Sequence, residues 1–181
     1  MKSIAVASLL LVGCMYTDRP SNYYQLYIDP AFGTDMPAIE HAAAVWMREV
    51  NKYSASNDLR LVIHEENYTC STWDSRCVGV ITVHPASLAN VASMCSGQVG
   101  DVHGCTYRQQ QHEDLTVPSN DWANCYIAAG INDLPHVATH ELGHGMGLQH
   151  TYNREDVMDP YTGAAVPDTV DVMQWEWNSG L

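Results

Sequence analysis

The sequence has few basic residues and no long apolar run. Only 8 residues are Lys or Arg against 21 Asp and Glu, so the formal net charge of the 181-residue chain is −13. Nucleic-acid binding needs a basic face, and electrostatic binding to anionic lipid needs clustered Lys and Arg. The composition therefore excludes nucleic-acid-binding proteins and proteins that bind membranes through a polybasic segment. No apolar stretch reaches the roughly 18 residues of a membrane-spanning helix, and neither repeats nor low-complexity tracts are present. The 46% hydrophobic content predicts a globular chain with one domain.

The first residues have the pattern of an export signal. Lys2 is followed by residues 4–12 (IAVASLLLV), whose length suits a signal-peptide core and is too short to span a bilayer. The run ends Leu11-Val12-Gly13-Cys14, which resembles the bacterial lipobox, where the signal is removed just before a Cys that becomes lipidated. The alternative is an ordinary signal peptide with a structural Cys14, but no small-x-small cleavage site follows the core.

We therefore expect a signal peptide over 1–13, a lipidated N-terminus and polar tether over 14–22, and one domain over 23–181. Met15 stands where an Asp would indicate inner-membrane retention, which favours an outer-membrane or cell-surface lipoprotein. The lipid anchor would be the membrane contact, and a monomer is expected.

Export implies an oxidising compartment in which disulfides form. Without Cys14, five of the six cysteines remain, enough for two bridges and one free thiol. Cys70–Cys77 is the first choice because both residues lie in one polar loop. Cys95–Cys105 is the second, which leaves Cys125 over. Pairing of Cys125 with Cys95 or Cys105 stays open at this stage.

Hydrophobic periodicity predicts an α+β fold. Apolar residues recur at helical spacing from Ile39 to Tyr53, with Thr34 or Asp35 as the cap, and a second helix follows a cap at Asn132 or Asp133. A strand-helix-strand-strand opening before a helix that bears a site argues for one α+β domain. Expected strands are 24–29, 59–64 and 78–83, the last of them central; 105–108 is a possible short strand, and 168–177 a last helix.

The strongest motif is His140-Glu141-Leu-Gly-His144 with His150 beyond it. His140 and His144 are one helical turn apart, so both imidazoles can share one metal. Glu141 can reach a water on that metal without being a ligand. Gly147 permits the chain to turn so that His150 folds back as third ligand. Three His leave a fourth tetrahedral position for water, the arrangement of catalytic rather than structural zinc. The alternative without a metal site is a surface helix that happens to carry several His.

This extended motif resembles the metzincin metalloproteases. Val157-Met158-Asp159-Pro160 resembles their Met-turn, whose Met forms an apolar floor beneath the metal, and its spacing is most similar to the matrixin branch. The resemblance covers roughly 134–177 and implies a small twisted mixed sheet, two main helices (one of them the active-site helix) and a C-terminal helix after the Met-turn. It also implies a specificity pocket walled by Pro160, Tyr161 and Thr162, and an extended substrate paired with an edge strand.

Two features of the family are missing. Between Cys14 and the first strand lies no propeptide with a Cys that could cap the zinc. The family's structural zinc and calcium loop is matched only faintly by His84, Asp101 and His103, without its glycine-rich sequence. A second zinc or a calcium ion is therefore possible but unsupported.

The function that these patterns predict is zinc-dependent endopeptidase activity on protein or peptide substrates, with one catalytic zinc and Glu141 as general base. The alternative is a non-catalytic zinc-binding envelope lipoprotein or adhesion module. Retention of Glu141 argues against the alternative, because zinc binding does not need that residue.

Overall fold

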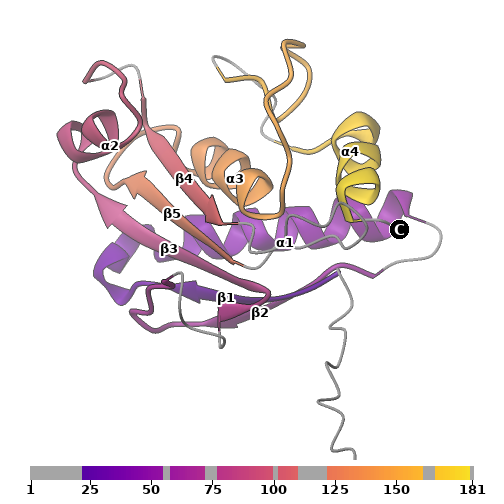
Figure 1. Cartoon of the computed structure of the whole chain (residues 1–181), viewed down its shortest axis with the longest axis horizontal. Helices are drawn as coiled ribbons and strands as arrows, with labels where there is room; N and C mark the ends of the chain where they lie inside the picture. Colours follow the sequence, from indigo (N-terminus) through magenta and orange to yellow (C-terminus); the bar gives the residue numbers. More distant parts are fainter. Residues whose placement is uncertain are drawn as a thin grey trace, which may run out of the picture.

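The computed structural model describes residues 22–54, 58–71, 77–99, 102–109, 122–160 and 166–179. The expected signal peptide and Cys14 lie outside this part of the chain. The elements, in order, are β1 (Tyr23–Ile28), a 3-10 helix η1 (Pro30–Asp35), α1 (Met36–Tyr53), β2 (Arg60–His64), β3 (Val80–Ala86), α2 (Leu88–Met94), β4 (Gly104–Gln109), β5 (Trp122–Ala128), α3 (Leu134–Gly145) and α4 (Thr169–Ser179). The predicted α+β class is confirmed (Figure 1).

The strands form one mixed sheet in the order β2-β1-β3-β5-β4. The first four are parallel, and β4 runs antiparallel to β5. β3 has two strands on each side, so the expectation that this buried apolar run is the central strand is confirmed. β4 forms one edge of the sheet and lies beside α3 (Figure 1).

Two helices cover one face of this sheet. Leu26, Ile81 and Cys125 come from three neighbouring strands and share one buried cluster with residues of α1 and α3. Trp46 of α1 is fully buried there, and its indole Nε1 donates to the carbonyl oxygen of Thr139 in α3 at 2.7 Å. This bond joins the two helices one residue before His140. Among the described residues, no helix is long and apolar enough to cross a membrane.

Besides the short η1, two elements were not predicted from the sequence. β5 has the sequence WANCYIA and is buried on nearly every residue, so its side chains show no alternation of polar and apolar positions. α2 has only 7 residues and begins at Ser87, whose hydroxyl accepts a hydrogen bond from Asn90 N. The possible strand at 105–108 is part of β4.

The predicted helix caps are corrected in detail. Asp35 precedes α1, but its side chain makes no capping bond to that helix. Its Oδ2 accepts instead from Gly130 N at 2.7 Å, in the turn after β5. Asp133 precedes α3 without capping it and pairs with His103. Asp35 and Asp133 were predicted to cap the helices that follow them, but both carboxylates instead bond to residues distant in the sequence.

The structure contains the two disulfides that were placed first from sequence, Cys70–Cys77 and Cys95–Cys105. The second joins the end of α2 to the edge strand β4. Cys125 is free and fully buried between the sheet and α3, and this burial raises the pKa of its thiol. The thiol is a small packing group here rather than a reactive one.

Candidate metal centre

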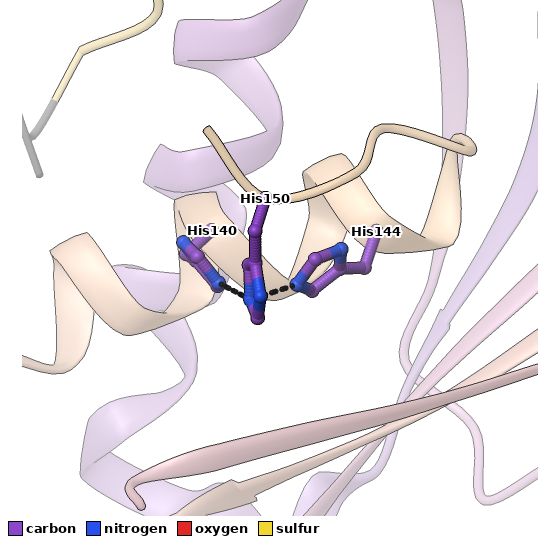
Figure 2. Close-up of side chains that lie close together, drawn as sticks. All are labelled: His140, His144 and His150. Atoms are coloured by element: carbon purple, nitrogen blue, oxygen red, sulfur yellow. Dashed lines mark hydrogen bonds between the residues drawn. The ribbon is translucent and has the colours of Figure 1, made fainter. Parts of the chain in front are cut away.

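Three imidazoles converge at the end of α3. His150 Nε2 lies 3.3 Å from His140 Nε2 and 3.0 Å from His144 Nε2 (dashed lines in Figure 2). His140 and His144 point from the helix, while His150 comes from the chain that returns above it (Figure 2). In the described part of the chain, these three form the single group of three or more His, Cys, Asp or Glu side chains close enough to share an ion.

The fold of the chain after α3 explains how His150 returns. Gly147 has φ +103°, a conformation that is strained for any residue with a Cβ. Gly147 N donates to His144 O and Leu148 N donates to Gly143 O, the paired bonds of a Schellman helix end. The predicted turn at Gly147 is therefore present, and it ends the helix immediately after the second imidazole.

Backbone carbonyls fix the orientation of the two helical imidazoles. His140 Nδ1 lies 2.8 Å from Val157 O, and His144 Nδ1 lies 2.9 Å from Leu148 O. A carbonyl can only accept, so each Nδ1 carries the hydrogen and each Nε2 is left with a lone pair facing the centre. This is the tautomer that a metal-binding His requires.

The electrostatics of the group also suit a cation. Burial lowers the pKa of His140 to about 3 and that of His144 to about 4, and the neighbouring imidazoles add to the effect in each case. Burial lowers the pKa of His150 too, while the Asp159 carboxylate opposes the shift. The three rings are therefore neutral at physiological pH, ready to donate lone pairs without first losing protons.

Zinc fits this donor set. Zn–N bonds of about 2.0–2.1 Å at tetrahedral angles require nitrogens about 3.3 Å apart, close to the 3.0 and 3.3 Å found here. Without an ion, a hydrogen on His150 Nε2 would have to serve the Nε2 lone pairs of both His140 and His144. The arrangement leaves a fourth tetrahedral position, because the described chain supplies three ligands to this group.

Glu141 lies beside the group and is not part of it. Its side chain is 5% exposed and faces β4, where Thr106 Oγ1 donates to Glu141 Oε2 at 2.6 Å. Burial raises the pKa of Glu141 to about 7, and the Thr106 hydrogen bond opposes the shift. A carboxylate with this pKa can both take and return a proton near neutral pH. Thr106 could not be identified from the sequence, because a lone Thr in a weak strand pattern gives no indication of its partner.

Met158 is fully buried behind the ligand helix. A Cβ placed on Gly143 would lie 2.5 Å from Met158 Sδ, so the thioether occupies space that only a glycine at 143 leaves free. Gly143 is on the same helix face as His140 and one residue before His144. Pro160 follows within the described chain and is partly buried; Tyr161 and Thr162, the other expected pocket residues, lie outside it.

The second metal site that the sequence left possible is not formed by the described residues. His84 Nδ1 pairs with Asp29 at 3.7 Å and its Nε2 bonds Thr82 at 2.8 Å, whereas His103 pairs with Asp133 at 3.4 Å. The two histidines thus belong to separate pairs, and Asp101 lies outside the described residues. No structural metal is assigned.

Comparisons with known proteins bear on the family and the fold of the chain. The chain matches the family model described as Matrixin (Peptidase_M10) over residues 41–176. The solved structure of metalloproteinase-II from Bacteroides fragilis is similar in fold, with a TM-score of 0.51 and 12% sequence identity. The match covers 86% of this chain and 52% of that one, so this chain spans about half the length of the Bacteroides protein. The search of curated proteins gave no match. Since the family model covers most of the sequence, the chain belongs to the matrixins, a family of zinc metalloproteases.

Proposed function

We propose that this matrixin is an endopeptidase in which His140, His144 and His150 hold one zinc ion and Glu141 is the general base. The observation that carries the proposal is the convergence of three imidazole Nε2 atoms beside a buried carboxylate. The two helical rings are held in the ligating tautomer by backbone carbonyls.

The chemistry that zinc supplies when bound is polarisation of the scissile carbonyl and easier deprotonation of water. Glu141 takes a proton from the attacking water and later delivers it to the nitrogen of the leaving amine. Its pKa of about 7 suits both transfers. The side chains of His140 and His144 keep their orientation throughout, because their Nδ1 hydrogens stay bonded to Val157 O and Leu148 O.

The edge strand β4 gives an extended substrate a place to bind. β4 is an edge strand of the sheet, and its residue Thr106 is hydrogen-bonded to Glu141. A peptide that pairs its backbone with this edge would run past the zinc position in an extended conformation. Backbone pairing is independent of the ends of the substrate, which favours cleavage within a chain. Pro160, Tyr161 and Thr162 are proposed as the wall of the pocket beyond the cleaved bond.

The test uses purified protein and a fluorogenic peptide library. A strong chelator should abolish cleavage and zinc should restore it, while metal analysis of the active protein should give about one zinc per chain. Glu141→Gln should keep the metal and the melting temperature but lower turnover by about 10²–10⁴-fold. Active protein without zinc, or a Glu141→Gln variant near wild-type rate, would reject the mechanism. A wild-type protein that binds zinc and cleaves nothing would support the non-catalytic alternative.

We also propose that the chain is exported and anchored through Cys14. The support from the described residues is the pair of disulfides, which are typical of oxidising compartments. Intact-mass analysis of membrane-extracted protein should show acyl chains on Cys14 with residues 1–13 absent, and Cys14→Ala should remain a precursor or become soluble. A mature N-terminus at another residue would refute the anchor.

A further inference from the structure

Two neighbouring residues of the sheet contact the residue assigned as general base. Thr106 of β4 is paired in register with Cys125 of β5. Thr106 Oγ1 lies 2.6 Å from Glu141 Oε2 and 3.2 Å from Glu141 O, and the Cys125 thiol lies 3.5 Å from the same carbonyl oxygen. The hydroxyl has one hydrogen, and the shorter distance assigns it to the carboxylate. A distance of 2.6 Å is typical of a charge-assisted O–H···O⁻ bond.

Gly104 provides the space for the same carboxylate. It lies two residues before Thr106 in β4, so both residues belong to one face of the strand. A Cβ on Gly104 would lie 2.5 Å from Glu141 Cγ and 2.7 Å from Cδ, closer than non-bonded carbons approach. Gly104 is not among the glycines with positive φ, so its backbone accepts other residues without strain. The contact with Glu141 is therefore the reason that glycine is needed here.

From these contacts we propose that β4 holds Glu141, with Thr106 as a positioning residue for proton transfer and Gly104 as the gap that admits the carboxylate. The inference rests on the proposed role of Glu141 as general base. A free Glu side chain samples many rotamers, whereas Thr is stiff at χ1, so the Thr106 hydroxyl has a direction set by the strand. It bonds to Oε2, so Oε1, which lies over Gly104, is the oxygen that would accept the proton from water.

In this proposal β4 has two roles: it pairs with the substrate backbone and it positions Glu141. A base fixed before substrate arrives needs no reorientation in the transition state, and this raises turnover rather than affinity. The imidazoles of His140 and His144 do not depend on Thr106 or Gly104, because their partners are the carbonyls of Val157 and Leu148, and His150 comes from the chain that follows α3. Loss of the support should therefore separate turnover from zinc binding.

The first experiment removes the hydroxyl. Thr106→Val keeps the shape of the side chain and should lower kcat by about 10–100-fold, with KM within about twofold and zinc content unchanged. Thr106→Ser keeps the donor and should restore most of the rate. Thr139→Val is the matched control, because this buried hydroxyl bonds Pro135 O inside α3 and should leave kcat near wild type.

The combination with Glu141→Gln shows whether Thr106 acts through the base. If it does, Thr106→Val should cost little further turnover in the Glu141→Gln background. A wild-type kcat for Thr106→Val, with Glu141→Gln inactive, overturns the positioning role and leaves the proposed function standing. A fully active Glu141→Gln variant instead overturns the proposed function itself.

The second experiment needs no activity. Gly104→Ala should lower the melting temperature of the zinc-loaded wild type, because the new methyl group meets Glu141. In a Glu141→Ala background the carboxylate is gone, so the same substitution should lower the melting temperature little or not at all. Equal losses in both backgrounds would show that Gly104 serves another purpose and would overturn the inference. This comparison stays informative even if Thr106→Val folds poorly.

Discussion

The Nδ1 of His140 lies 2.8 Å from the carbonyl oxygen of Val157, the residue immediately before Met158. The segment that follows the third ligand is thereby tied to the first. Thr151 N also donates to Met158 O at 3.0 Å, which closes the loop between His150 and the Met. The Met-turn thus both orients a ligand and packs beneath the helix that carries it.

Met158 should contribute packing rather than metal ligation. Its side chain is fully buried. Met158→Leu conserves volume and should cost under about 1.5 kcal/mol of unfolding free energy, whereas Met158→Ala leaves a cavity and should cost about 2–5 kcal/mol. Urea unfolding and metal analysis measure both effects. Complete loss of zinc in Met158→Leu would contradict a packing role.

Gly143 should not tolerate alanine, although alanine favours helices. The helix would gain about 1 kcal/mol in propensity, but the new methyl would lie 2.5 Å from Met158 Sδ and 3.0 Å from Trp46 Cζ2. Overpacking costs about 1–3 kcal/mol, so a net loss of stability is expected in chemical denaturation. In the Met158→Ala background the clash with Sδ is gone and only the contact with Trp46 remains, so Gly143→Ala should then cost clearly less stability. If Gly143→Ala lost the same stability in both backgrounds, its methyl group would not be clashing with Met158.

Gly147→Ala should weaken both stability and zinc binding. At φ +103° a Cβ is strained, at a cost of about 1–3 kcal/mol, and it would also meet the Arg108 guanidinium. The turn carries Leu148 O, the acceptor of His144, so zinc affinity measured by chelator competition should fall. Gly130→Ala is the control, since Gly130 has φ +73° and nothing near its Cβ position. It should lose stability while keeping the wild-type zinc affinity.

Asp171 gives a prediction about pH. Burial raises its pKa, and the bonds from Asp168 N and Val157 N to Oδ2 oppose the shift. The folded protein holds this proton to higher pH than the unfolded chain does. Its contribution to stability is therefore present at low pH and lost as pH rises from about 3 through the raised pKa.

Asp171→Asn removes the titrating carboxyl group and with it this pH-dependent contribution to the free energy of unfolding. The unfolding free energy of the variant minus that of the wild type should grow as pH rises toward neutrality, and the comparison cancels protonation of the histidines. Urea unfolding over a pH series measures the difference. Glu155→Gln, which removes an exposed charge from the loop that contains Val157, should show no such growth. A difference that is constant or shrinks with pH would contradict the assignment.

The features that could be predicted from the sequence are those formed by residues close together in the chain. The spacing of His140 and His144, the turn at Gly147 and the bridge between Cys70 and Cys77 all involve residues near one another in the chain. Thr106 could not be predicted, because its meeting with Glu141 depends on the register of β4 against β5 and on the docking of α3. β5 itself was missed for a related reason: a strand buried on both faces lacks the alternation that identifies a half-exposed one.

The hydrogen bonds around the imidazoles have a consequence for the order of folding. The three His and the carbonyls that orient two of them lie within residues 140–158, so the ligand set closes only short loops. Thr106 meets Glu141 across 35 residues, and that contact requires the sheet edge to be in place. Short loops close at lower entropic cost than long ones. The chain should therefore be able to form its ligand set before the strand that contacts Glu141 has docked, so the proposed metal uptake would precede the proposed activity.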